Sequence, residues 1–348
     1  MKTLIYYFFK LFVRTGLFFY SKKTTVIGSE RIPKNEAVIF TANHPNGLID
    51  PLLIATHIKR RTNFLVRAAV FNNPIIAKFF NLLGMMPIYR IRDGVQQLSK
   101  NEEIFNKCQL ILKNNKTLLI FPEGTHKKDR TVRPLSKGFT RIIFKTLDNF
   151  PDTKINIVPV GITYQNVSSY PSKTAIHFGS PILANNYYDK QNINQSVKNI
   201  KELVSNQLED LSVHIKQDEN YETILSTLNN AQVDFTKVNH VNALIKDKKI
   251  LPQKKRSINY ALPLLLLIVL NSLVPYSIWK LLSKKVDEIE FIDTFRFGVN
   301  AILFPLFYCI QSWVINIFLG WKIALLYFLT SFLLILLYTK LSITPPSK

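Results

Sequence analysis

The C-terminal part of the chain contains three long runs without a charged residue, and these runs limit its fold more than any other feature. They are 22, 25 and 17 residues long and cover residues 258–279, 297–321 and 323–339. A helix needs about 20 apolar residues to cross the hydrocarbon core of a bilayer. One such run alone would fit a helix in a protein core, but three in succession with aromatic ends favour a membrane. The sequence therefore predicts a transmembrane region over 257–348.

We expect about three spans in this region. Their predicted limits are 258–279, 297–318 and 321–340. The short link Gly320-Trp321-Lys322 predicts that the last two spans form a helical hairpin. A basic segment precedes the first span and contains Lys246, Lys248, Lys249, Lys254, Lys255 and Arg256. Because positive residues stay on the cytoplasmic side, this segment predicts a multi-pass protein of the cell (inner) membrane with its body on the cytoplasmic face.

Residues 1–23 are predicted to form an amphipathic helix that lies in the membrane interface. Lys10 and Arg14 fall near one face at helical spacing and leave a wide face of Phe, Tyr and Leu. A signal peptide is the competing interpretation, but Lys10 splits the apolar region and no small-residue cleavage site follows.

Short apolar segments alternate with amphipathic ones over residues 24–185, which predicts one α/β domain with a mixed sheet layered by helices. The predicted strands are 24–27, 37–42, 63–67, 86–90, 116–121, 155–163 and 174–179. The predicted helices are 51–60, 74–83, 95–114 and 137–148. Asp50 and Pro51 suit the N-cap and the first position of one of these helices.

Residues 186–256 are polar, rich in Asn and Lys, and predicted to form a helical extension. An apolar stripe at three- and four-residue steps indicates that this extension packs on the α/β domain. The stripe consists of Val197, Ile200, Val204, Leu208, Leu211 and Ile215.

Two polar segments follow predicted strands and carry the groups best suited to catalysis. His44 and Asp50 follow the strand at 37–42, and Glu123 follows the strand at 116–121. Open α/β sheets carry their sites at the carboxyl ends of strands. A histidine with a nearby carboxylate is a general base with a partner that orients it.

These segments resemble motifs of the glycerophospholipid acyltransferases, a PlsC-like family that acylates glycerol 3-phosphate or lysophosphatidate. The family shows a His-x4-Asp motif, an Arg-bearing motif, Phe-Pro-Glu-Gly, and a Val-Pro-Val-like strand, in that order. The chain has similar segments in the same order: His44 to Asp50, Gly84 to Arg90, Phe121 to Gly124, and Ile157 to Val160. The resemblance covers residues 25–185.

The chain departs from the family pattern at two places. Five residues separate His44 from Asp50, where the family has four, and we expect the extra residue to be absorbed near Asn46 and Gly47. His126 stands where the commonest family form has Arg. Together with the C-terminal spans, this region is most similar to the membrane-spanning glycerol-3-phosphate and dihydroxyacetone-phosphate acyltransferases.

The resemblance implies a role for each matching residue. His44 is the expected base and Asp50 its partner, and a guanidinium at Arg90 suits a phosphate. Arg92 and Arg130 are weaker candidates for the same role, although Arg130 also fits a solvated loop. The expected substrate-binding residues are Asn43, Arg90, Glu123, Gly124, Thr125 and Lys137.

The implied reaction moves a fatty acyl group from acyl-CoA or acyl carrier protein to glycerol 3-phosphate, dihydroxyacetone phosphate or 1-acyl-glycerol 3-phosphate. Membrane lipid is the implied partner, and no cofactor is implied. Two alternatives stay open: acylation of another lipid acceptor, such as an aminoacyl lipid, and a catalytically silent member that only binds lipid.

Other chemistries find little support in the sequence. The net charge of +22 suits nucleic acid as well as anionic membranes, but no zinc-finger spacing or RNA-binding motif accompanies it. The six histidines are scattered and no Cys-x-x-Cys occurs, so no metal site is expected. A serine hydrolase is disfavoured because Gly-x-Ser-x-Gly is absent, and Cys108 lacks a flanking base pattern.

Overall fold

The computed structural model describes residues 2–89, 95–248, 251–254, 258–286 and 291–344. Several residues singled out by the sequence lie outside these ranges. They are Arg90, Arg92, Lys249, Lys255 and Arg256.

The centre of the molecule is a mixed sheet, as the sequence predicts, and the described residues form eight strands of it where the sequence predicts seven. The strands lie in the order β1-β7-β6-β2-β5-β3-β4, and β8 pairs with β6. Neighbouring strands are parallel except for the pairs β6–β7 and β6–β8. Their bounds are β1 Lys23–Ile27, β2 Ala37–Ala42, β3 Thr62–Arg67, β4 Met85–Ile88, β5 Thr117–Ile120, β6 Ile155–Tyr164, β7 Lys173–Phe178 and β8 Ile182–Leu183. The short β8 was not predicted.

Alternating side chains of β2 divide the core between the two faces of the sheet, because successive residues of a strand point to opposite sides. Ala37 and Ile39 face one core cluster, while Val38 and Phe40 face the other. The first cluster is covered by α4 (Asn101–Lys113), α5 (Gly138–Asn149) and α6 (Ile193–Leu211). The second is covered by α2 (Ile49–His57), with Leu17 of the N-terminal helix and Phe297 of a C-terminal helix.

Several helix limits differ from the predicted ones. The helix expected at 95–114 is a 3₁₀ segment over Val95–Lys100 followed by α4, and α3 covers Pro74–Leu82. The extension forms three helices, α6, α7 (Tyr221–Asn230) and α8 (Val238–Lys246). Ile200, Val204 and Leu208 of the predicted stripe pack in the core, but Ile215 lies beyond the end of α6 and joins a separate cluster with α7 and α8.

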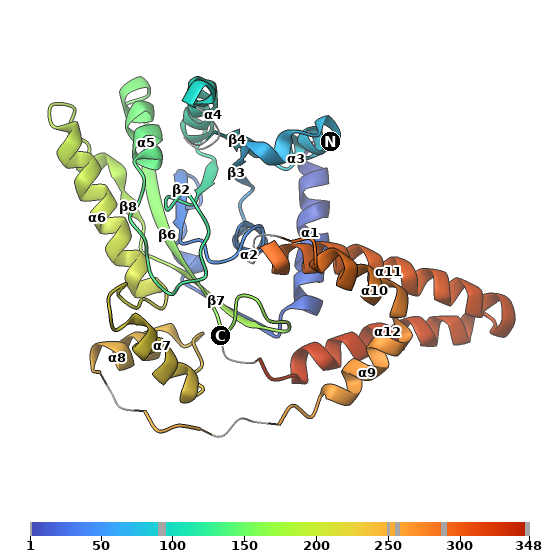
Figure 1. Ribbon diagram of the computed structural model, residues 1–348. Helices are drawn as coiled ribbons and strands as arrows, with labels where there is room; N and C mark the ends of the chain where they lie inside the picture. Colours follow the sequence, from blue (N-terminus) through green and yellow to red (C-terminus); the bar gives the residue numbers. More distant parts are fainter. Residues whose placement is uncertain (1, 90–94, 249–250, 255–257, 287–290, 345–348) are drawn as a thin grey trace.

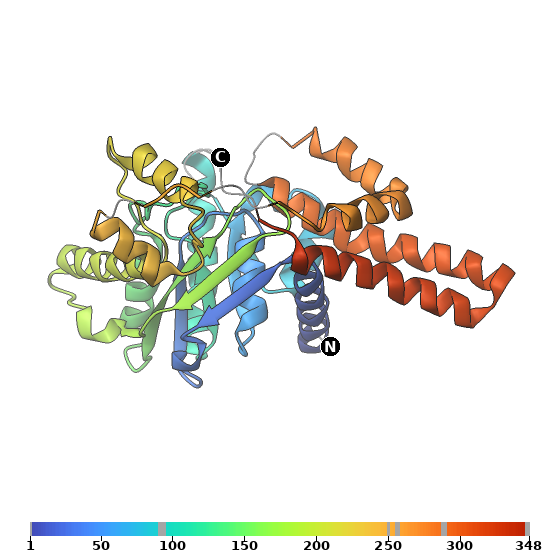
Figure 2. The same cartoon turned by 90° about the horizontal axis from the view of Figure 1, so that it is seen from below.

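The N-terminal helix α1 (Lys2–Tyr20) lies between the sheet and a long helical hairpin, as Figures 1 and 2 show. Tyr6 and Leu17 are buried against the domain. Large apolar side chains on the remaining surface are exposed, which is the pattern of a helix that contacts lipid. They are Leu4, Tyr7, Phe8, Leu11, Phe12 and Phe18.

The hairpin consists of α11 (Ile292–Leu319) and α12 (Trp321–Leu341), joined at Gly320 with a φ of 82°. It extends away from the sheet (Figure 1). Both helices are long and apolar enough to cross a membrane. The predicted link at Gly320-Trp321-Lys322 thus corresponds to the observed hairpin turn.

The first predicted span is not a straight helix. It is divided into α9 (Leu262–Asn271) and α10 (Leu273–Ser283), which are bent by 100° at the break. Pro275 has no N–H to bond the carbonyl of Asn271, and Gln311 of α11 donates its amide N–H to that carbonyl at 3.2 Å instead. The predicted span at 258–279 corresponds to this bent pair, and the described helices include two that could cross a membrane, or three if the bent pair counts as one span.

Candidate active site

His44 and Glu123 lie at the same edge of the sheet. They follow β2 and β5, which are parallel neighbours in the register Val38–Thr117 to Thr41–Ile120. The carboxyl ends of parallel neighbours meet at one edge, which is where open sheets carry their sites. The His44 ring stacks on Phe121 with 3.9 Å between the ring centroids. The two motifs are thus in direct contact.

Asp50 reaches the imidazole of His44 despite the longer spacing. Its Oδ2 lies 2.8 Å from Nδ1 of His44 and accepts the backbone N–H of Asn46 at 2.7 Å. Its Oδ1 accepts the hydroxyl of Tyr164, in β6, at 2.7 Å. The carboxylate is fully buried, and only 16% of the His44 side chain is exposed. An ionised Asp50 holds the proton of His44 on Nδ1 and leaves the lone pair on Nε2.

The turn between the two residues accommodates the extra residue in the Asn46–Gly47 region. The N–H of Asp50 bonds the carbonyl of Asn46 at 3.2 Å, while Asn46 donates its own N–H to the Asp50 side chain. Helix α2 begins at Ile49 and its N-cap is Leu48, with no side-chain cap. The expectation that Asp50 caps this helix is therefore wrong, since its carboxylate bonds the turn before the helix.

Burial sets the protonation of the pair. It lowers the pKa of His44 from 6.5 to about 3, with Glu123 raising the value and Arg133 lowering it. The imidazole is therefore neutral at pH 7, as a general base must be. Burial also raises the pKa of the Asp50 carboxyl, and the hydrogen bonds from Tyr164 and from the Asn46 backbone oppose this effect by favouring the ionised form.

Glu123 braces the loop after β5 through Arg133, a residue that the sequence analysis missed. Arg133 donates from Nη2 to Oε2 of Glu123 at 2.5 Å and from Nε at 3.1 Å. Its backbone N–H bonds Oε1 of Glu123 at 3.2 Å, and its Nη1 bonds the hydroxyl of Thr125 at 2.5 Å. The carboxylate of Glu123 is 2% exposed, whereas 21% of the Arg133 side chain is exposed. Arg133 is thus a partly exposed cation that lies close enough to His44 to affect its pKa.

Gly124 allows the turn between Glu123 and Thr125. Its φ is +75°, a conformation that side chains rarely adopt, although a Cβ there would meet no atom within 4 Å. The turn therefore needs glycine for its backbone and not for space. Thr125 contributes its hydroxyl to Arg133, so both residues shape the position of the guanidinium.

Asn43 binds the neighbouring strand with both ends of its amide. Its Nδ2 donates to the carbonyl of Ile162 at 3.0 Å, and its Oδ1 accepts the N–H of Ile162 at 2.7 Å. Ile162 belongs to β6, so the amide extends the β2–β6 pairing beyond the end of β2. Asn43 thereby anchors the chain immediately before His44.

Arg130 and Lys137, two further candidates from the sequence, both form hydrogen bonds with main-chain groups. Arg130 is buried, donates to the carbonyls of Tyr164 and Gln165 at 2.9 and 3.0 Å, and lies over the Phe235 ring. Because its side chain is buried and bonds two main-chain carbonyls, the solvated-loop interpretation of Arg130 is wrong; burial also lowers its pKa to about 10. Lys137 is exposed and its carbonyl accepts the N–H of Arg141 at the start of α5.

The first turn of α11 packs on the His44 turn, an arrangement that the sequence analysis did not foresee. Asp293 accepts the amide N–H of Asn46 at 2.9 Å, and Thr294 accepts the backbone N–H of Leu48 at 3.0 Å. Tyr20 of α1 also donates its hydroxyl to Asp293. The sequence offered one indication of this contact, because Asp293 is the last acidic residue before the second uncharged run.

Cys108 is buried in α4, and burial raises its pKa to about 12, which suppresses the reactive thiolate. Across the described part of the chain, no group of three or more His, Cys, Asp or Glu side chains is arranged to hold a metal ion.

Residues 23–163 match the family model described as Acyltransferase. Among curated proteins, glycerol-3-phosphate O-acyltransferase 1 of Saccharomyces cerevisiae is 28% identical over 119 residues, which cover 33% of this chain and 15% of that protein. The 1-acyl-sn-glycerol-3-phosphate acyltransferase of Cocos nucifera is 26% identical over 186 residues, which cover 51% of this chain and 56% of that protein. The chain thus spans less than two thirds of either relative.

The chain is also similar in part to a solved structure. The 1-acyl-sn-glycerophosphate acyltransferase PlsC of Thermotoga maritima aligns with 62% of this chain and 83% of that chain, with a TM-score of 0.45 and 22% identity.

Proposed function

We propose that this protein, whose residues 23–163 form an acyltransferase domain, transfers a fatty acyl group from a thioester donor to a glycerol phosphate acceptor in phosphatidate synthesis. The observation that carries the proposal is the 2.8 Å contact between His44 and Asp50 at the sheet edge that also holds Glu123 and Arg133. The printed activities of the two relatives, on glycerol 3-phosphate and on its 1-acyl derivative, support the acceptor class.

In the proposed reaction, Nε2 of His44 takes the proton of an acceptor hydroxyl. The hydroxyl oxygen forms a bond to the thioester carbonyl carbon, and the bond from that carbon to sulfur breaks. The imidazolium, stabilised by Asp50, returns its proton to the departing thiolate. No covalent acyl-enzyme is needed, and acyl-CoA or acyl carrier protein would serve equally as donor.

We assign the acceptor phosphate to the guanidinium of Arg133, with Arg90 as the second candidate from the sequence. Nη1 of Arg133 keeps one N–H beyond those that bond Glu123 and Thr125, and a charge-assisted hydrogen bond from this N–H to a phosphate oxygen is short and strong. Glu123 and Thr125 hold Arg133 in place, and the partly exposed side chain lies close enough to lower the pKa of His44. Glu123 then acts on the acceptor through Arg133.

Helix α1 and the hairpin α11–α12 support a position of the site at the membrane surface. The exposed apolar side chains of α1 and the hairpin α11–α12 would hold the site at the lipid surface, where an acyl chain partitions. The basic segment before α9 supports a cytoplasmic position of the domain. Labelling of single cysteines at position 240, in α8 of the extension, and position 320, in the hairpin turn, from each side of sealed vesicles tests this orientation.

The experiment that tests the function uses the full-length protein purified in detergent. Labelled acyl-CoA is supplied with glycerol 3-phosphate, dihydroxyacetone phosphate, 1-acyl-glycerol 3-phosphate or an aminoacyl lipid in separate reactions. We expect transfer to one or more of the phosphorylated acceptors. Transfer to the aminoacyl lipid alone would contradict the acceptor class, and absence of transfer to all four would favour a silent lipid-binding protein.

A further inference from the structure

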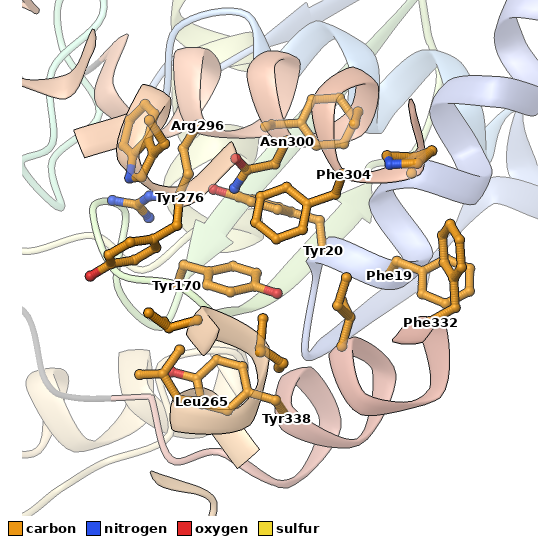
Figure 3. Close-up of a pocket in the computed structure, with 18 of the residues that line it drawn as sticks. Phe19, Tyr20, Tyr170, Leu265, Tyr276, Arg296, Asn300, Phe304, Phe332 and Tyr338 are labelled. Atoms are coloured by element: carbon orange, nitrogen blue, oxygen red, sulfur yellow. The ribbon is translucent and has the colours of Figure 1, made fainter. Parts of the chain in front are cut away.

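A large cavity lies on the other side of Asp293 from the His44 turn. Its volume is about 540 Å³, within the range of about 300–1,000 Å³ that is typical of ligand pockets. The walls come from α1, the loop between β6 and β7, and all four C-terminal helices. They include Tyr20, Tyr170, Leu265, Trp279, Phe304 and Tyr338 (Figure 3).

The cavity has one polar end and one apolar end. Arg296 and Tyr276 direct nitrogen and oxygen atoms to one end, whereas Phe19 and Phe332 lie at the other (Figure 3). Lys280 also lines the cavity and is exposed, and none of the described lining residues is acidic. A ligand that matches these walls has a long apolar part and a negative charge at one end.

Asn300 provides a polar contact on the wall of the cavity. Its Oδ1 is buried and has no hydrogen-bond partner among the described residues. A buried carbonyl oxygen without a donor is costly, so a ligand that supplies a hydroxyl group would be favoured here. A hydroxyl next to a negative charge and an acyl chain is a common combination in glycerophospholipids.

We propose that this cavity binds an anionic membrane phospholipid, with an acyl chain among Phe19, Phe304 and Phe332 and its phosphate facing Lys280 and Arg296. The hairpin α11–α12 and the bent pair α9–α10 place the cavity among the helices that are apolar enough to meet lipid. This lipid site is separate from the proposed reaction centre, because Tyr20 and Arg296 bond Asp293 between the cavity and Asn46.

Photo-crosslinking tests the proposal on the full-length protein in phosphatidylcholine nanodiscs. One probe is phosphatidylglycerol with a diazirine in one acyl chain, and the other is phosphatidylcholine with the same label. We expect the anionic probe to label peptides that contain Leu265, Phe332 or Tyr338 about tenfold more than the neutral probe, the ratio for one charge-assisted contact. The same experiment on His44→Ala separates lipid binding from acyl transfer.

Two pairs of variants locate the binding. Ala301→Trp fills the cavity, whereas Ile302→Trp places the same side chain on the exposed surface of α11. Lys280→Glu reverses the charge at the polar end, and Lys322→Glu makes the same change at the exposed start of α12. We expect labelling by the anionic probe to fall about tenfold in Ala301→Trp and in Lys280→Glu. In Ile302→Trp and Lys322→Glu it should stay at the wild-type level. Equal labelling by the two probes, or equal labelling within either pair, would overturn the proposal.

Discussion

At the scale of single residues, the site depends on how many donors surround one buried carboxylate. Asp50 accepts hydrogen bonds from Tyr164 and Asn46 and contacts His44, so three groups fix the position of this carboxylate beside the imidazole. The sequence identified the pair of His44 and Asp50, because both stand next to a predicted strand end. It could not identify Tyr164, which comes from a strand 114 residues further along the chain.

We predict that Asp50→Asn lowers turnover by about 10²–10⁴-fold. An amide can still turn its oxygen towards His44 and Asn46, but it has no negative charge to fix the tautomer of His44 or to stabilise the imidazolium. Steady-state kinetics measure this loss. Tyr164→Phe removes only the bond to Oδ1 and is the control, for which we expect a much smaller decrease. Equal turnover in Asp50→Asn and the wild type would mean that the carboxylate is structural.

The pH dependence of the reaction should reflect the low pKa of His44. The base is active when neutral, and burial keeps it neutral far below the ordinary value of about 6.5. We therefore predict that kcat/KM stays constant as pH falls through 6.5 and decreases only at lower pH. A pH–rate profile with soluble glycerol 3-phosphate checks this. A midpoint at or above 6.5 would show that the imidazole is not buried in the active protein.

Arg133→Gln should raise the KM for the phosphorylated acceptor by about tenfold or more while the KM for the acyl donor changes little. The loss of one charged hydrogen bond costs about 1.5–3 kcal/mol. Arg141→Gln is the control, because Arg141 forms an exposed ion pair with Glu102 on the distant surface of α5. If both Michaelis constants rise equally in Arg133→Gln, the assignment of the phosphate to this residue is wrong.

At the scale of elements, α11 is both a predicted membrane span and a wall of the His44 turn. Gly47 marks the contact, because a Cβ there would lie 2.9 Å from Oγ1 of Thr294 and 3.0 Å from the Phe291 ring. Only glycine lets the first turn of α11 approach so closely. The contact joins the His44 turn to a helix that is apolar enough to cross a membrane.

We predict that Gly47→Ala lowers kcat by separating Thr294 from the N–H of Leu48 and thereby shifting His44. Gly298→Ala is a matched control on α11, since a Cβ at that position would meet nothing within 4 Å. Activity and melting temperature of both variants provide the measurement. A Gly47→Ala variant that is as active as Gly298→Ala would show that the packing of α11 does not position the base.

The strands and most helices of the domain were predictable because hydrophobic periodicity reports burial directly. The bend between α9 and α10 was not, since an uncharged run of 22 residues looks like one span. The break is stabilised by residues far along the chain: Tyr308 hydrogen-bonds Ser272 at 2.7 Å, and Tyr327 donates to Asn271 at 2.7 Å. Local pattern cannot show such partners. The same reason explains why Arg133 and Asp293 were missed.

At the scale of the whole molecule, the sheet, α1 and the hairpin form one assembly around the His44 turn. The first helix supplies Tyr20, the domain supplies Asn46, and the hairpin supplies Asp293, and these three side chains meet at one buried point. The hairpin, whose helices are apolar enough to cross a membrane, therefore contributes to the architecture of the site. We propose that acyl transfer takes place at the edge of the sheet that follows β2 and β5, with His44 as the base.

Acyl transfer by His44→Ala, compared with the wild type and with His240→Ala, tests this claim most directly. His240 is exposed on α8, so its replacement controls for the loss of a histidine. Labelled acyl-CoA and the preferred phosphorylated acceptor are supplied to each protein in nanodiscs. We predict that His44→Ala loses about 10²–10⁴-fold in turnover with an unchanged melting profile, while His240→Ala remains fully active. Turnover by His44→Ala at the wild-type rate would contradict the account.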